Sequence, residues 1–112
     1  MTRYQSSSNI SLAPQMLALA PVESQAFLGF DHAAKRSDGE IPPKIREWIP
    51  LAVALTTHCA YCLDVHAKAA KKFGTTRQKL AEIALIAAAV RAGATVGHGL
   101  LALRLFDEEQ PA

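Results

Sequence analysis

Residues 57–74, with the sequence THCAYCLDVHAKAAKKFG, decide how this chain folds. Thr57 suits the N-cap of a helix, because its hydroxyl can accept a backbone N–H of the first turn. Gly74 suits the position just after a helix end, because glycine adopts a left-handed backbone without steric penalty. The stretch therefore predicts a helix that begins near Cys59 and ends before Gly74. Its apolar face carries both cysteines and His66.

Cys59 and Cys62 are the only two cysteines, and they form a CxxC pair in the first turn of that helix. Positions three apart on a helix have Cα atoms roughly 5 Å apart, a separation that a disulfide accepts. Free N–H groups and the positive end of the helix dipole stabilise a thiolate at such a position. His66 follows Cys62 by four residues and lies one turn along the same face. The spacing predicts a reversible dithiol with an imidazole beside it.

A preceding helix, predicted from about Pro43 to Thr56, supplies a partner for the imidazole. Pro50 lies inside this pattern and predicts a kink or a short break. Glu47 lies roughly 14 Å from the end of this helix, and His66 lies roughly 10 Å into the next one. In a helical hairpin the two side chains reach a similar height, so a carboxylate, an imidazole and two thiols converge.

The composition predicts an all-α protein, a compact bundle of about five to six helices. The chain has 21 alanines and 13 leucines, which are strong helix formers, and strand formers do not cluster in alternating runs. Thr75 and Gln78 predict a capping box, and Gly93 predicts a helix end. We expect further helices over about 21–36, 75–92 and 95–107. We also expect an N-terminal segment over residues 1–20, part of it mobile, and a single domain over residues 21–112.

Charge and hydropathy exclude several classes of protein. The net charge of +2 over 112 residues is too balanced for a basic nucleic-acid-binding face. The longest apolar run, residues 83–90, has eight residues, against the roughly 20 that cross a bilayer. The N-terminus lacks the apolar core of a signal peptide. We therefore expect a cytoplasmic protein that binds neither nucleic acid nor membranes, with reduced thiols. An alanine-rich core buries little area per residue, so we also expect a homo-oligomer.

The spacing of the four candidate site residues resembles a known family. The chain matches the pattern of the alkylhydroperoxidase D-like (AhpD-like) proteins, which is Glu47, eleven residues, Cys59, two residues, Cys62, three residues and His66. These belong to the carboxymuconolactone decarboxylase superfamily. A weaker resemblance in helix order covers about residues 21–106. One position departs from the pattern, because the best-known members have a histidine where this chain has Tyr61.

The resemblance implies a thiol-based antioxidant activity in a homotrimer or homohexamer, so we expect an enzyme that acts as a peroxidase or a disulfide reductase through its redox-active CxxC pair. It implies that Cys62 attacks the peroxide, that Cys59 resolves the sulfenic acid into a disulfide, and that His66 and Glu47 relay the proton. No metal, flavin or other cofactor is implied. The electrons come from a dithiol reductant, by resemblance a lipoylated or thioredoxin-like protein. Where relatives use the extra histidine, that role is absent here or moved to His58.

Three other interpretations fit part of the pattern. A structural zinc site would use the cysteines and His66, with His58 or Glu47 as the fourth ligand. The superfamily also contains decarboxylases that act as lyases on a muconolactone, but these lack the CxxC pair. The third interpretation is a non-enzymatic, redox-sensing oligomer whose thiols oxidise slowly. Peroxide turnover with a dithiol reductant separates the last interpretation from an enzyme.

Overall fold

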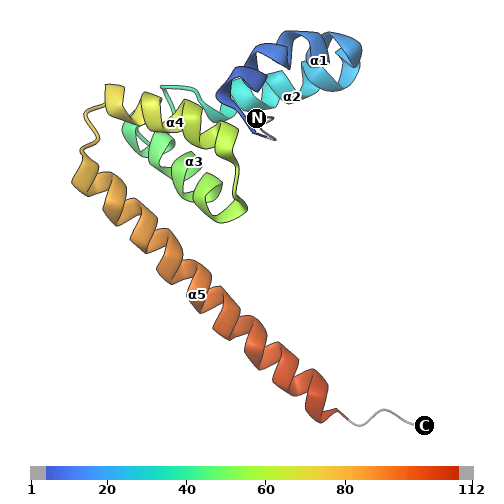
Figure 1. The fold of residues 1–112 in the computed structure, drawn as a ribbon, viewed down its shortest axis with the longest axis vertical. Helices are drawn as coiled ribbons and strands as arrows, with labels where there is room; N and C mark the ends of the chain where they lie inside the picture. Colours follow the sequence, from blue (N-terminus) through green and yellow to red (C-terminus); the bar gives the residue numbers. More distant parts are fainter. Residues whose placement is uncertain (1–4, 109–112) are drawn as a thin grey trace.

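The protein is helical throughout the part that the computed structural model describes, residues 5–108 (Figure 1). The prediction of an all-α fold with the CxxC pair at the start of a helix is confirmed. The elements in chain order are a 3-10 helix η1 (Ser7–Leu12), α1 (Ala13–Leu19), α2 (Pro21–Ala34), α3 (Pro43–Thr57), α4 (Ala60–Lys72) and α5 (Arg77–Asp107).

Helices α3, α4 and the first part of α5 form the packed core. α3 lies against both of the other helices, and Leu51 of α3 is fully buried between them. Its buried neighbours are alanines: Ala54 of α3, Ala70 of α4 and Ala87 of α5. Alanine has the smallest side chain that still favours a helix, so the helix axes can approach closely. The core therefore fixes the α3–α4 hairpin, on which all four candidate site residues lie.

Polar contacts hold the start of α5 against the start of α3. The indole Nε1 of Trp48 donates to Oγ1 of Thr75 at 2.9 Å. The predicted capping box is wrong by one residue, because Thr76 is the N-cap of α5 and its hydroxyl accepts the Lys79 N–H at 3.2 Å. Lys79 lies near Lys44 and lowers the pKa of Lys44, because a Lys79 N–H can donate only to the neutral Lys44 amine and because the two positive charges repel.

Helix α3 runs unbroken through Pro50, so the predicted break does not occur. The proline removes one backbone donor from the helix, but Leu51 and Ala54 directly after it are buried against α4 and α5. A proline inside a helix costs about 3 kcal/mol or more, and burial of these two side chains offsets that cost.

The turn between α3 and α4 lies one residue later than the sequence predicts. Thr57 is the last residue of α3, not a cap of α4, and its hydroxyl donates to the Val53 carbonyl at 2.9 Å. His58 takes the left-handed conformation, with φ 60° and ψ 43°, and reverses the chain. The Cys59 N–H then donates to the Ala54 carbonyl at 3.0 Å. This left-handed residue places Cys59, rather than Thr57, at the N-cap of α4.

Replacing His58 with glycine is expected to stabilise the fold. A left-handed backbone costs a residue with a Cβ about 1–2 kcal/mol, and glycine avoids this cost. Glycine also loses more conformational entropy on folding, which lowers the gain by about 0.5–1 kcal/mol. The net gain is therefore about 0.5–1 kcal/mol. Urea unfolding followed by circular dichroism measures it, with His58→Ala as the control that keeps the strain. Equal stabilities of the two variants would contradict a strained His58.

Helix α5 continues through Gly93, so the predicted end at residue 92 and new start at residue 95 are wrong. Added Cβ atoms at Gly93, Gly97 or Gly99 would meet nothing within 4 Å, so no close contact within the chain requires these glycines. A glycine in a helix costs about 1 kcal/mol relative to alanine. The alanines and leucines around the three glycines compensate for this, and the helix remains regular.

The N-terminal helices connect to the core at two places. Arg46 of α3 donates through Nη1 to the Ala34 carbonyl and through Nε to the Ile41 carbonyl, each at 2.8 Å. Helix η1 lies against α4. Residues 7–19 of the expected N-terminal segment are thus helical, while the boundary at residue 20 stays a prediction.

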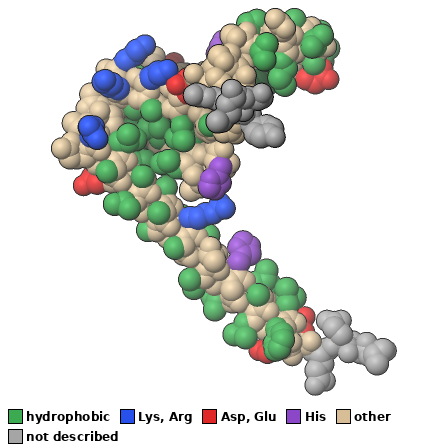
Figure 2. Space-filling model, viewed as in Figure 1, with side chains coloured by type: hydrophobic (Ala, Val, Ile, Leu, Met, Phe, Trp, Pro, Cys, Tyr) green, Lys and Arg blue, Asp and Glu red, His purple; other side chains and the backbone are tan. Residues whose placement is uncertain are grey.

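The second part of α5 extends away from the rest of the molecule (Figure 1). Patches of hydrophobic side chains lie on its visible face, between stretches of other surface (Figure 2). Phe106 is 86% exposed and Leu100 is 68% exposed. The radius of gyration is 19.0 Å, whereas a compact globule of this length has about 13 Å. By length and composition alone, α5 (residues 77–107) could cross a membrane. This was not predicted from the sequence, because the longest uninterrupted apolar run has only eight residues.

Candidate active site

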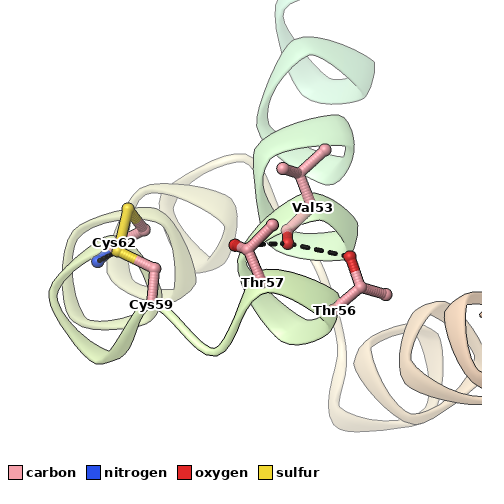
Figure 3. Close-up of a disulfide and its surroundings, with 5 residues drawn as sticks. All are labelled: Val53, Thr56, Thr57, Cys59 and Cys62. Carbon is pink, nitrogen blue, oxygen red and sulfur yellow. Dashed lines mark hydrogen bonds between the residues drawn. A yellow bond between two sulfur atoms is a disulfide. The ribbon is translucent and has the colours of Figure 1, made fainter.

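The two cysteines lie where α3 turns into α4 (Figure 3). They form a disulfide, and their Cα atoms are 5.3 Å apart, as the helical spacing predicts. Cys59 is the N-cap of α4, and its sulfur accepts the backbone N–H of Cys62 at 3.3 Å. The first turn of α4 holds no acidic residue. The positive end of the helix therefore acts on the sulfurs without a competing carboxylate in that turn.

A carboxylate and an imidazole meet between α3 and α4. Oε2 of Glu47 lies 2.7 Å from Nδ1 of His66, a short hydrogen bond typical of a charge-assisted pair. The side chains of Glu47 and His66 are 17% and 13% exposed, so the pair is mostly shielded from water. The hairpin thus brings together the two residues that the helix rise places at one height.

The Glu47 contact determines which nitrogen of His66 is available for chemistry. Because the carboxylate accepts from Nδ1, the neutral ring carries its proton there and leaves a lone pair on Nε2. Nε2 can take a proton from a neighbouring group and, once protonated, return it. Cys62 lies one helical turn before His66 on α4, which makes its thiol the nearest reactive group along that face.

The structure joins the four candidate residues as two pairs on one hairpin. Cys59 and Cys62 are bonded covalently, and Glu47 and His66 are joined by a hydrogen bond. In this disulfide state no hydrogen bond links Cys62 to His66 among the contacts of residues 5–108. The arrangement can carry out dithiol–disulfide exchange with a proton relay next to it. Within the same residues, no three His, Cys, Asp or Glu side chains gather to hold a metal ion.

Residues 21–105, which include all four candidate residues, match the model of one known protein family, the carboxymuconolactone decarboxylase family. The chain belongs to the carboxymuconolactone decarboxylase family. This family includes the alkylhydroperoxidase D-like proteins.

Two other proteins are similar in sequence to this family member. The chain is 36% identical over 72 residues to a Paracoccus denitrificans protein named "Uncharacterized protein 4 in cox locus", over 64% of this chain and 65% of the relative. It is 32% identical over 87 residues to an uncharacterized protein of Cupriavidus necator, over 78% of this chain and 76% of the relative. The chain thus spans slightly less than two thirds of the first relative. Neither name states an activity.

One contact at the site comes from outside the part that matches the carboxymuconolactone decarboxylase family. Nδ2 of Asn9 in η1 donates to the hydroxyl of Tyr61 at 2.9 Å. Tyr61 lines an open pocket with Leu63, Asp64 and residues 5–7, on the side of α4 that faces η1. The tyrosine between the cysteines is thus tied to the N-terminal segment. The role of Asn9 could not be predicted from the sequence. It follows a run of serines, and no local pattern there indicates that the Asn9 side chain contacts a distant residue.

Two further histidines lie apart from the Glu47–His66 pair. His58 is exposed in the turn before Cys59. His98 shares an open groove with Arg91, Ala94 and Thr95, all from α5 itself. Among the described residues, no side-chain hydrogen bond or ion pair joins either histidine to Glu47 or to the cysteines.

Proposed function

We propose that this chain is a thiol-dependent antioxidant enzyme with alkylhydroperoxidase (peroxiredoxin-type) activity. The observation that carries the proposal is the Glu47–His66 hydrogen bond one helical turn from the Cys59–Cys62 pair. A disulfide by itself fits many roles. A shielded carboxylate–imidazole pair beside a dithiol supplies the proton transfer that peroxide reduction needs.

In the reduced enzyme Cys62 is the nucleophile. Nε2 of His66 takes the Cys62 proton, and the thiolate attacks one oxygen of the peroxide. The O–O bond breaks, the alkoxide leaves with the proton from His66, and Cys62 becomes a sulfenic acid. The Cys59 sulfur then attacks the Cys62 sulfur, and hydroxide leaves with the Cys59 proton as water. The sum is two thiols and one hydroperoxide giving one disulfide, one alcohol and one water.

A dithiol reductant closes the cycle, and we propose a lipoylated or thioredoxin-like protein in the cytoplasm for this role. It gives two electrons and two protons to the disulfide and becomes a disulfide itself. No cofactor takes part in this scheme. A lyase acting on a muconolactone would have no use for this electron transfer.

A thiol count tests the proposed function directly. The purified protein is reduced, freed of reductant under nitrogen and mixed with one equivalent of an alkyl hydroperoxide. We expect two thiols per chain to disappear as an intramolecular disulfide, which mass spectrometry detects as a loss of two hydrogens. Persistence of both thiols for an hour would overturn the enzymatic proposal and leave a slow redox sensor. Repeated peroxide turnover with a dithiol reductant would exclude the interpretation as a slow redox sensor.

We further propose that the protein assembles as a homotrimer or homohexamer through α5. A groove of about 310 Å³ between α3 and α5 has apolar walls, formed by Ala52, Val53, Ile86, Ala87, Val90 and neighbouring residues. Beyond this groove, every residue from 95 to 107 is exposed. Although the whole helix is long enough to cross a bilayer, its exposed part carries Arg91, His98 and Arg104, and charged side chains are costly inside a membrane. A second copy of the chain is therefore a better cover for these side chains than lipid.

Light scattering is expected to give a mass of at least three chains of 12.0 kDa each. The variant Leu100→Glu/Leu103→Glu, which places two charges on the exposed apolar surface of α5, is expected to lower that mass. Gln78→Glu, at the exposed start of the same helix, is the matched control and keeps the assembly. A monomer at micromolar concentration in the wild type would contradict the proposal.

A further inference from the structure

The two sulfurs of the disulfide have different surroundings. Cys59 stands at the N-cap of α4, where its sulfur accepts the Cys62 N–H at 3.3 Å and faces the positive end of the helix. Cys62 lies inside the first turn and has given its own N–H to Cys59. Its nearest titratable neighbour along the helix face is His66, whose other nitrogen is bound to Glu47. A negative charge on Cys59 is thus stabilised by the backbone, whereas a negative charge on Cys62 depends on transfer of its proton to His66.

We propose that the reductant attacks Cys62, that Cys59 leaves as a thiolate, and that the mixed disulfide with the reductant forms on Cys62. A thiol–disulfide exchange runs faster when the departing sulfur is the better-stabilised thiolate. The Cys62 N–H and the helix end are already aimed at Cys59 before the bond breaks, so no rearrangement is needed. The inference deepens the proposed function, on which it rests for the redox cycle of the pair.

The electrons and atoms of the two exchanges balance. The first donor thiolate bonds to the Cys62 sulfur, and the electron pair of the Cys59–Cys62 bond goes to Cys59. The second donor thiol then loses its proton to Nε2 of His66 and attacks the donor's first sulfur, which closes the donor's own disulfide. Cys62 leaves and takes the proton from His66, and Cys59 gains the proton that the first donor thiol had lost to solvent. The protein has gained two electrons and two protons, and the donor has lost them.

One sulfur therefore receives both reactants. The peroxide oxygen and the donor sulfur bond in turn to Cys62, next to His66, and Cys59 acts only within the pair. Specificity for the peroxide and for the reductant is then decided at the same sulfur. The two reactants meet Cys62 in different oxidation states, the peroxide as a thiolate and the donor as a disulfide, so they react with it in turn.

A trapping experiment on the oxidised full chain locates the mixed disulfide. The probe is 2-mercaptoethanol, followed by an acid quench and alkylation with excess N-ethylmaleimide at low pH, where exchange is frozen. Chymotrypsin cleaves after Tyr61 and separates the two cysteines, so mass spectrometry reads each adduct on its own peptide. We expect the mercaptoethanol adduct on Cys62 to exceed that on Cys59 by about tenfold. An equal share, or an excess on Cys59, overturns the proposal.

A matched pair of variants at Ala60 tests the physical reason. This exposed residue follows Cys59 directly, so Ala60→Glu places a carboxylate beside the departing thiolate, whereas Ala60→Gln adds the same bulk without charge. We expect the glutamate to raise the adduct share on Cys59 several-fold and the glutamine to leave it unchanged. Identical shares in both variants would overturn the role of the helix end. Because the probe is a simple thiol, a failure of peroxide reduction leaves these results intact and is distinguished from a failure of this inference.

Discussion

Cys62→Ser is expected to abolish peroxide reduction, and Cys59→Ser is expected to complete one oxidation and then stop. Cys62 lies one helical turn from His66, whose free Nε2 can take its proton, whereas Cys59 lies nearly two turns away. Without Cys62 no thiol near the base can attack the peroxide. Without Cys59 the sulfenic acid on Cys62 forms but has no thiol in the chain to resolve it.

The measurement is peroxide consumption together with a sulfenic-acid probe such as dimedone, located by mass spectrometry. In Cys59→Ser we expect one equivalent of peroxide to be consumed and the label to be found on Cys62. In Cys62→Ser we expect neither. A dimedone label on Cys59 in Cys62→Ser, formed at the wild-type rate, would reverse the roles of the two cysteines.

Glu47→Gln is expected to slow peroxide reduction on the order of 10²-fold, the usual contribution of an acid–base group. The 2.7 Å contact sets the Glu47 carboxylate beside Nδ1 of His66, where its negative charge can stabilise the positive charge that develops on the ring as Cys62 gives up its proton. Glutamine fills the same space and can still accept from Nδ1, so the fold and the ring orientation survive. What is lost is the charge, and the effect reaches Cys62 only through His66.

The pH dependence of iodoacetamide alkylation at Cys62 separates this relay from a structural role. We expect the alkylation midpoint to move to higher pH in Glu47→Gln and in His66→Ala than in the wild type, because the thiolate loses its proton acceptor. Glu82→Gln removes an exposed carboxylate from α5 and serves as the control for charge alone. Coincident profiles for wild type, Glu47→Gln and His66→Ala would make the pair a structural contact.

The helical hairpin and the placement of Glu47 beside His66 could be predicted from the sequence because both depend on local rules. Helix rise alone sets the heights of the two residues, and glycine chemistry sets the end of α4, where Gly74 has φ 82°. The junction at His58 could not be predicted, since histidine seldom adopts a left-handed backbone and the tertiary turn imposes it. The Asn9–Tyr61 contact also joins residues 52 positions apart, which no local pattern encodes.

The uninterrupted α5 shows where local rules give the wrong result. Gly93 has the chemistry of a helix end, but a helix ends only when another conformation has lower free energy. Around Gly93 no turn residue or proline offers one, and alanine lies on both sides. Gly93 therefore destabilises the helix by about 1 kcal/mol relative to alanine, but the helix continues through it.

If the protein assembles through α5 as proposed, the exposed end of this helix is expected to couple folding to protein concentration. Residues 95–107 are all exposed and contain two glycines, and a helix of this length is marginal in water without a partner. In an isolated chain this end is expected to unwind, and its amides should exchange with solvent at nearly the rate of an unfolded peptide. Association would then supply the free energy that orders the last turns. Dilution should lower the helix content from the C-terminal end first, while the hairpin that holds the cysteines remains folded.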